Sequence, residues 1–529
     1  MPNPTVRGRG LLLALVAATP LTAAPLAAQS GRLGTISFPT SGPPPAQRPF
    51  LRGVLLLHSF EYEDAAKAFR EAQRVAPGFA MAYWGEAMTR THPVWNQQQP
   101  DSARAILARL APTREARSAR ARTARERGYL EAVEILYGEG SKARRDTLYS
   151  AAMGRLAAAY PRDLEAQAFY ALSLLGLNQG TRDVPTYMRA GAIAQEVLRR
   201  NPDHPGAAHY VIHAFDDPAH APLGLPAARA YAKIAPGAAH AQHMTSHIFV
   251  ALGMWDETVA ANVVALGPDR PAWTPSHYSA WLAYAYLQQG RTAEARRLLE
   301  TVRGNLGDPP RQHFRLYLQA MRAHHIVVSE DWADSSIAWK MDTAGTGPVV
   351  QAMDAFALGY AALRRGDRSE ADAQAARLHA LATRSPAADD EEADPQVVAI
   401  LDTELRAALR AADGAPDEAV ALLRQAASIE DTMPVAFGPP DVVKPTHELL
   451  GELLLAQGKP GEAQQEFVRS LGLAPRRSAS LLGLARAAAA AGDAPVADQA
   501  RADLRTIWHQ ADEDLPGLAE IARPSAQAR

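Results

Sequence analysis

Histidine is the residue type whose number and spacing in this sequence could support chemistry. Seven of the 16 histidines gather in one stretch: His204, His209, His213, His220, His240, His243 and His247. Two pairs in this stretch, His209 with His213 and His243 with His247, are four residues apart, so each pair would lie on one face of a helix. Because two imidazoles at this spacing can bind one metal ion, the stretch predicts a metal site.

The interval between the two pairs carries further information. His209 precedes His243 by the same interval that separates His213 from His247. If this interval is the period of a structural repeat, the pairs occupy equivalent positions on neighbouring helices whose axes lie about 8 to 10 Å apart. We therefore expect the four imidazoles to converge on one divalent transition metal, zinc or copper, with nickel and iron as alternatives.

Other side chains near the pairs could line the same site. His240 lies one helical turn before His243, Asp216 follows the first pair, and His204 precedes it. The alternative is that these polar rings line a groove that binds a peptide, or form hydrogen bonds to a neighbouring loop.

His58 and His92 are separated by the same interval. This spacing would place each of them late in the first helix of one of two successive repeats. Trp95 follows and could line the same groove. The helical stripe between them is expected to pack in the core and consists of Tyr83, Trp84 and Met88.

Recognised catalytic signatures are missing from the sequence. His447-Glu448 lacks the second histidine of a zinc-protease motif, and no nucleophile elbow, phosphate-binding loop or dinucleotide fingerprint occurs. This weakens an enzymatic interpretation, although a metal-bound water needs only three protein ligands and an open position. A metal-dependent hydrolase or oxidase and a metal-sequestering protein without turnover therefore stay open as alternatives.

The helices that carry these histidines belong to a repeat. Its period, about 34 residues, equals the interval between the two histidine pairs. The clearest unit begins at Lys444 and places small or apolar residues at fixed offsets: Gly451, Leu454, Gly458, Ala463, Phe467 and Pro475. A copy near the N-terminus has Gly53, Leu56, Ala65, Phe69, Ala72 and Pro77. These offsets, and a period of about 34 residues, are typical of tetratricopeptide (TPR) repeats. With many alanines and only 7% aromatic residues, they predict an all-α, TPR-like solenoid of helical hairpins, wound as a right-handed superhelix with a concave face.

The chain is predicted to contain an N-terminal export signal, a linker and three repeat regions. Residues 1–28 combine Arg7 and Arg9 with a short apolar run and small residues, the pattern of a secretory signal peptide. A linker follows over residues 29–45, and repeats are expected over residues 46–160, 161–345 and 346–529. Two interruptions are predicted to be loops: a solvated acidic run over Ser385–Pro395 and an extended segment over Phe215–Pro226.

Charge and composition limit the classes of partner that this protein is expected to bind. The net charge of −2 gives no overall positive field for nucleic acid, and no apolar run is long enough for stable membrane insertion. The absence of cysteine excludes disulfides and thiolate metal sites. We expect an exported protein, periplasmic or extracellular, that binds a protein or peptide in its concave groove.

The chain also resembles a family of uncharacterised exported bacterial TPR proteins. The resemblance covers roughly Phe38 to Trp281 and is carried by LLLHSFEYEDAAKAFREAQRVAPGFAMAYWGEAM from Leu55, HPGAAHYVIHAFDD from His204 and HAQHMTSHIFVALGMW from His240. The resemblance implies a repeat scaffold in the cell envelope. It implies no established activity and leaves the histidines unexplained.

Overall fold

The structure is a computed structural model that describes residues 31–177, 182–343, 345–384, 394–434 and 437–521. These residues form 25 α-helices, α2 to α26, which pack as consecutive hairpins. The predicted all-α, TPR-like fold is confirmed. The predicted signal peptide and most of the acidic run, residues 385–393, lie outside the described residues.

The first half of the chain contains α2 (Pro44–His58), α3 (Tyr62–Val75), α4 (Ala80–Met88), α5 (Pro100–Leu110), α6 (Arg114–Arg120), α7 (Ala124–Leu136), α8 (Lys142–Ala159), α9 (Leu164–Leu175), α10 (Val184–Arg200), α11 (Pro205–Ala214), α12 (Ala221–Ile234), α13 (Ala239–Ala251) and α14 (Trp255–Leu266). Between α4 and α5 lie strand β1 (Thr91–His92), the 3-10 helix η1 (Pro93–Trp95) and strand β2 (Gln97–Gln98). The two strands pair antiparallel, with Thr91 opposite Gln98.

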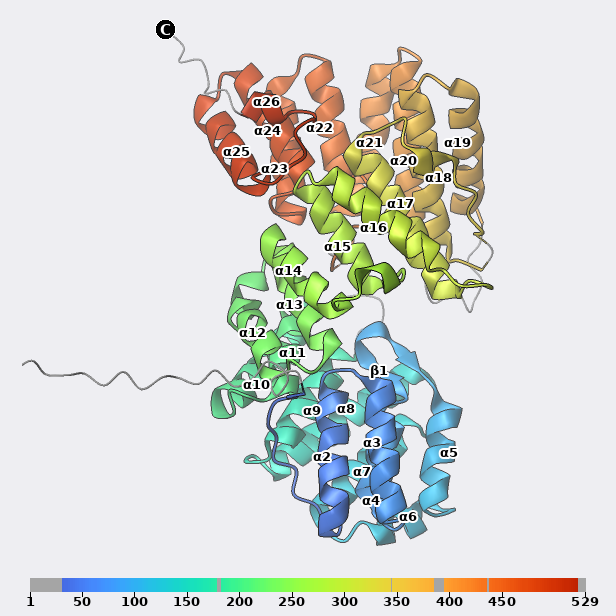
Figure 1. Ribbon diagram of the computed structural model, residues 1–529, viewed down its shortest axis with the longest axis vertical. Helices are drawn as coiled ribbons and strands as arrows, with labels where there is room; N and C mark the ends of the chain where they lie inside the picture. The colour runs from blue at the N-terminus through green and yellow to red at the C-terminus, as the bar shows by residue number, and fades with distance from the viewer. Residues whose placement is uncertain (1–30, 178–181, 344, 385–393, 435–436, 522–529) are drawn as a thin grey trace, which may run out of the picture.

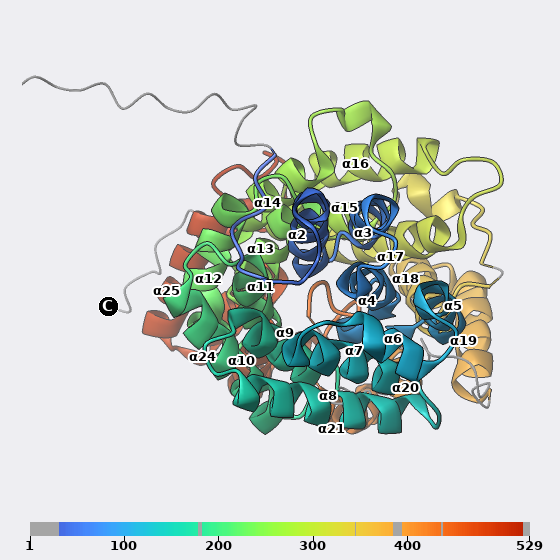
Figure 2. The same cartoon turned by 90° about the horizontal axis from the view of Figure 1, so that it is seen from below.

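The second half contains η2 (Arg270–Ala272), α15 (His277–Gln288), α16 (Thr292–Gly304), α17 (Gln312–Ser329), η3 (Ser335–Ala338), α18 (Pro348–Arg364), α19 (Arg368–Ala382), α20 (Pro395–Ala412), α21 (Pro416–Glu430), α22 (Thr446–Ala456), α23 (Pro460–Leu473), α24 (Ser478–Ala491), α25 (Ala494–Ile507) and α26 (Leu518–Ile521). N-terminal and C-terminal helices lie at opposite ends of the molecule (Figure 1). Seen from below, the path of the helices curves, so that α25 and α19 lie on opposite sides (Figure 2).

The hairpins are held together by the small and aromatic residues that the repeat predicts. Phe467 on α23 is fully buried, and a methyl group at Gly451 or Gly483 would collide with its ring. Phe69 on α3 is enclosed in the same way by Gly53 and Gly85. The glycines therefore let the helices approach closely enough for one phenyl ring to fill the space between them.

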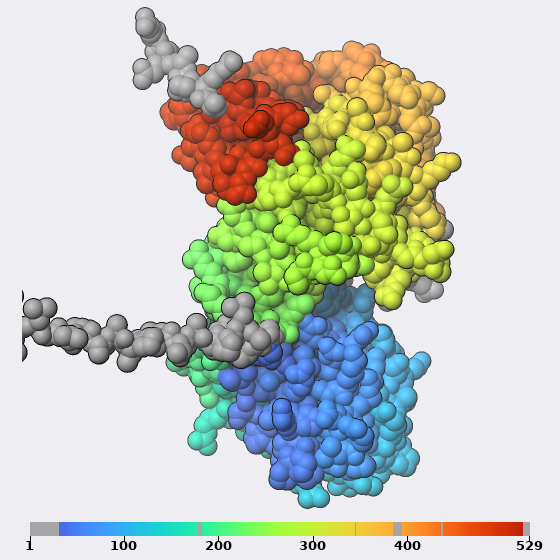
Figure 3. All heavy atoms as spheres, viewed as in Figure 1, coloured from blue at the N-terminus to red at the C-terminus, as the bar shows by residue number. Residues whose placement is uncertain are grey.

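The buried apolar residues form two large cores, which meet within α13. One core runs from Leu33 to Phe249, and the other from Val250 to Ile521. A smaller cluster surrounds α15 to α17. The histidine-bearing helices α11, α13 and α15 therefore lie where the two halves of the molecule join. In Figure 3 the green and yellow-green part of the chain lies midway between its blue and red ends.

The prediction for the segment that follows α11 is wrong. Phe215–Pro226 was expected to be an extended loop, but only a short turn precedes α12, which begins at Ala221. The Asp217 carboxylate closes the turn by accepting hydrogen bonds from the backbone N–H groups of Ala219 and His220. Pro222 lies in the first turn of α12, where a helix does not use the missing N–H.

The described residues give no sign of a membrane-spanning element. None of their helices has both the length and the apolar character that crossing a bilayer requires.

Candidate metal centre

Six histidines form two groups at the junction between the halves. His209, His213 and His240 make the first triad, and His243, His247 and His277 make the second. In each triad, one ring nitrogen per residue lies within 4.8 Å of the others. The structure thus divides the four predicted residues between two adjacent groups of three, and brings in His240 and His277 as the third members.

Both triads are built in the same way from the repeat. The i,i+4 pair of the first triad comes from α11, and His240 comes from the first turn of α13, the next first helix along the chain. The pair of the second triad comes from α13, and His277 is the first residue of α15. One repeat therefore supplies two ligands and the following repeat supplies the third.

The second triad has its imidazole protons fixed by neighbouring acceptors. The Nδ1–H of His243 donates to Oδ1 of Asn262 at 2.6 Å, and the Asn262 amide donates to the Thr258 carbonyl, which fixes the orientation of that amide. The Nδ1–H of His247 donates to the Asp216 carboxylate at 2.5 Å. In the neutral rings both protons are therefore on Nδ1, and both Nε2 atoms carry lone pairs.

These two Nε2 atoms face each other at 3.2 Å. Two lone pairs at this distance repel unless a cation, either a proton or a metal ion, lies between them. Two nitrogens bound to one tetrahedral zinc ion at the usual bond length lie about 3.3 Å apart. The spacing of His243 and His247 therefore fits two ligands of one ion.

The first triad shows a related arrangement. The Nδ1–H of His209 donates to the backbone carbonyl of His58 at 2.7 Å, which leaves the Nε2 lone pair of His209 facing Nε2 of His213 at 3.0 Å. His240 is also buried, and its Nε2 has no hydrogen-bond partner. An unpartnered buried nitrogen is costly, and it is available to a metal ion.

Burial favours the neutral form of His209, His213, His240 and His243. Removal from water lowers the pKa of His209 to about 3, with smaller contributions from neighbouring imidazoles. Burial likewise lowers the pKa of His213, His240 and His243 well below the ordinary value, and the other histidines lower it further. Neutral imidazoles are the form that binds a metal ion.

A third cluster contains His58, Glu165 and His204, all fully buried. Nε2 of His204 and Oε1 of Glu165 make no hydrogen bond there. Nδ1 of His204 accepts from the Ala207 backbone N–H, so its proton lies on Nε2, which faces Glu165 at 3.3 Å. His58 bonds Glu165 through Nε2 at 2.7 Å. Burial alone would raise the pKa of Glu165, but the His204 and His58 rings lower it to about 2. This predicted site residue, His204, therefore lies with His58 and Glu165 in a buried cluster outside both triads.

Trp95 and His92 lie at the edge of the first triad. Trp95 is 38% exposed, and its ring lies 6.0 Å from the ring of His240 and 5.5 Å from that of Phe60. His92 stacks on Tyr62 at 4.1 Å. The prediction that His92 lies late in a first helix is wrong, because α4 ends at Met88 and His92 is in β1. Pro93 follows it, and the residue before a proline disfavours helical geometry.

The core stripe on α4 is confirmed. Its members are buried, and they are Tyr83, Trp84 and Met88.

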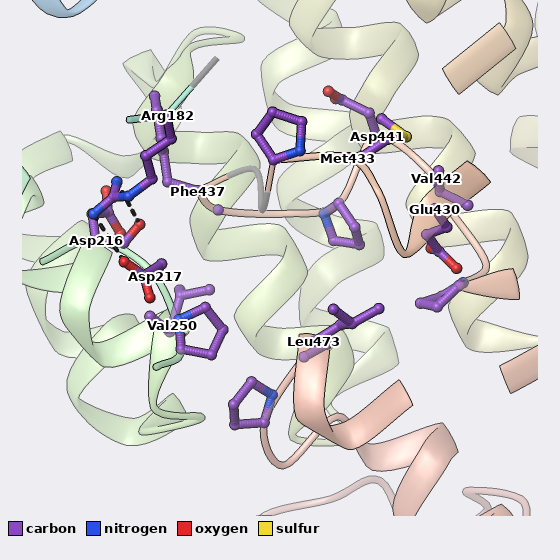
Figure 4. Close-up of a pocket in the computed structure, with 18 of the residues that line it drawn as sticks. Arg182, Asp216, Asp217, Val250, Glu430, Met433, Phe437, Asp441, Val442 and Leu473 are labelled. Atoms are coloured by element: carbon purple, nitrogen blue, oxygen red, sulfur yellow. Dashed lines mark hydrogen bonds and ion pairs between the residues drawn. The ribbon is translucent and has the colours of Figure 1, made fainter. Parts of the chain in front are cut away.

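Asp216 links the second triad to a cavity of about 310 Å³ between the two halves of the chain (Figure 4). Asp217 lies beside it and forms an ion pair with Arg182 at 2.9 Å. His220 also bonds Asp217, at 2.8 Å, and so stands outside both triads. Phe437 lines the cavity, and its ring packs 5.5 Å from that of His247.

Two contributors to the centre were missed from the sequence. His277 follows His243 at the same interval that separates the two pairs, so the repeat would have found it. Asn262 lies on α14, and no spacing signal distinguishes it from other polar residues of that helix.

Comparisons with known proteins give neither a family nor a function. Neither protein families nor curated proteins yield a match. Among solved structures, similarity is found to the human IFIT1 dimer with m7Gppp-AAAA, with a TM-score of 0.35 and 14% identity over 90% of this chain and 91% of that chain. The APC/C hetero-tetramer Cut9-Hcn1 gives a TM-score of 0.41 and 14% identity over 90% of this chain and 82% of that chain. The P58(IPK) TPR domain gives a TM-score of 0.22 and 15% identity over 69% of this chain and 100% of that chain. The fold and the site together define a TPR-like helical-repeat protein with buried histidine triads.

Proposed function

We propose that this protein binds transition-metal ions, zinc or copper, through its two histidine triads. The observation that carries the proposal is the pair of facing Nε2 atoms in the second triad, 3.2 Å apart, while both Nδ1–H groups are committed to Asn262 and Asp216. A cation between these nitrogens would relieve the repulsion of their lone pairs, and burial lowers the pKa of His243, which favours a metal ion over an added proton.

Binding of a protein or peptide is a second proposed function. It is supported by the TPR-like fold, since such solenoids present extended concave surfaces to their partners. The cavity beside Asp216 favours it further, because Phe437 and Val250 supply apolar surface next to the charged Asp217 and Arg182. A scaffold that carries metal sites fits both proposals.

The metal proposal is tested by calorimetric titration of chelator-treated protein with zinc sulfate and with copper sulfate, using protein that never met a nickel column. We expect tight binding that a His209→Ala/His243→Ala variant loses while keeping its helical circular dichroism spectrum. His379→Ala is the matched control, because that side chain is 59% exposed and far along the chain from the triads. Equal binding by the double variant and the wild type would refute the proposal.

Turnover separates an enzyme from a sequestering or delivery protein. A metal-dependent hydrolase or oxidase should lose activity in the His209→Ala/His243→Ala variant and regain none on adding metal. A sequestering protein should show the binding and no activity on ester, phosphoester, peptide or phenolic substrates.

Export to the periplasm or beyond is part of the proposal and follows from residues 1–28. Mass spectrometry of the protein from its native host should show a mature N-terminus close to Gln29 or Ser30. An intact Met1 in the cytoplasmic fraction would contradict export.

A further inference from the structure

The two triads are nearly as close to each other as their own members are. The rings of His213 and His247, one from each triad, lie 5.8 Å apart, and those of His240 and His243 lie 6.1 Å apart. Within the triads, the contacting rings are separated by 4.5 Å for His243 and His277 up to 5.8 Å for His247 and His277. Ions bound by the two triads would therefore lie close to each other.

Helix α13 fixes the triads relative to each other. Its first turn gives His240 to the first triad, and the next two turns give His243 and His247 to the second. Because one rigid helix supplies ligands to both, neither triad can shift without the other. This is the geometry of a single centre with two metal positions.

Ligand number and charge indicate what else such a centre would hold. Three imidazoles leave a zinc or copper ion with at least one unfilled position. Two divalent ions would bring four positive charges, whereas among the described residues two carboxylates are hydrogen-bonded to the triad residues, Asp216 to the His247 ring and Glu61 to the His240 backbone N–H. Buried charge in such excess is costly and attracts a counter-ion.

We propose that the two triads form one binuclear centre, with three imidazoles on each metal ion and a small anion, such as hydroxide, bridging the two ions. The proposal rests on the proposed metal binding and extends it. Bridging oxygen ligands between two ions are how two-metal sites in proteins orient or activate a small molecule.

The test uses copper(II) sulfate as the metal and sodium azide as a probe of the bridging position. Chelator-treated full-length protein should bind two copper ions per chain. Its electron paramagnetic resonance signal should integrate to far fewer than two spins, because two bridged copper(II) ions couple. Azide should titrate as one ion per two coppers, followed by its optical absorption band.

Single variants separate the two positions. His277→Ala removes a ligand of the second triad, and His240→Ala removes one of the first. Each should reduce the stoichiometry to one copper per chain and give the full signal of one isolated copper. His379→Ala should behave as the wild type, and circular dichroism checks that each variant is folded. If a variant unfolds, the spin count of the wild type and its ratio of bound azide to copper still test the binuclear centre.

The outcomes distinguish this inference from the metal proposal beneath it. One copper per wild-type chain, or two coppers with two full, uncoupled spins, would overturn the binuclear centre and leave metal binding intact. One azide per copper would likewise overturn the shared bridge. Failure to bind either copper or zinc would overturn both proposals.

Discussion

Replacing Asn262 with leucine should weaken metal binding without weakening the metal-free protein. Asn262 accepts the Nδ1–H of His243 and is itself fully buried. In the metal-free variant, His243 can move its proton to Nε2 and donate to His247, whose Nε2 is 3.2 Å away. The ring then keeps a hydrogen bond, and no buried N–H is left without a partner.

A bound metal ion excludes this alternative tautomer of His243. An ion on Nε2 forces the His243 proton back to Nδ1, where leucine offers no acceptor. A buried, unsatisfied donor costs about 1 to 3 kcal/mol, and each 1.4 kcal/mol is a tenfold change in affinity. The zinc affinity of the second triad should therefore fall between about 5-fold and about 150-fold.

Calorimetric zinc titration of chelator-treated protein measures this effect, and thermal unfolding of the metal-free form provides the comparison. Asn262→Asp is the matched control, because a carboxylate still accepts the Nδ1–H and should hold zinc at least as tightly. The reasoning fails if Asn262→Leu binds zinc as the wild type does, or if its metal-free form loses as much stability as its zinc-bound form.

Three further predictions concern stability. Phe467→Ala should cost about 3 to 5 kcal/mol, and hydrogen exchange should quicken first around α22 to α24; uniform quickening along the chain would argue against a repeat array. For His209, the folded pKa of about 3 lies below the unfolded value, so stability is complete above about pH 6.5 and falls as the pH drops toward 3. The loss from this residue is about 3 kcal/mol at pH 4.5, and urea unfolding of the metal-free protein should show less pH dependence in His209→Asn than in wild type. Glu165→Gln leaves the Nε2–H of His58 or His204 without its carboxylate partner, so it should lower the free energy of unfolding by about 3 to 5 kcal/mol. The zinc stoichiometry should not change. A changed stoichiometry would place a metal ion in the cluster of His58, Glu165 and His204.

The repeat made much of the fold predictable. A hairpin is specified by residues that recur at fixed offsets, and Gly451 with Phe467 repeats the spacing of Gly53 with Phe69. Segments that depart from the period were harder to assign. The chain after Phe215 looks like a loop because prolines usually break helices. Pro222, however, lies in the first turn of α12, where it replaces an N–H group that the helix does not use, and Pro226 is accommodated inside the helix.

The candidate site was predictable in its residue types but not in its grouping. The i,i+4 spacing places His209 with His213 and His243 with His247 on common helix faces. Which further ring completes each set depends on how successive first helices are rotated, and sequence offsets do not report rotation. The acceptors Asp216 and Asn262 come from a turn and from a second helix, so only tertiary packing brings them to the rings.

The most direct test of the metal proposal is anomalous X-ray scattering from crystals of the full-length protein, prepared from metal-free protein with zinc or copper added in small molar excess. The proposal predicts strong anomalous peaks at the absorption edge of the added metal, located within bonding distance of the Nε2 atoms of His243 and His247 and beside the His209, His213 and His240 rings. Peaks confined to surface residues such as His379, with the triads free of metal, would contradict it.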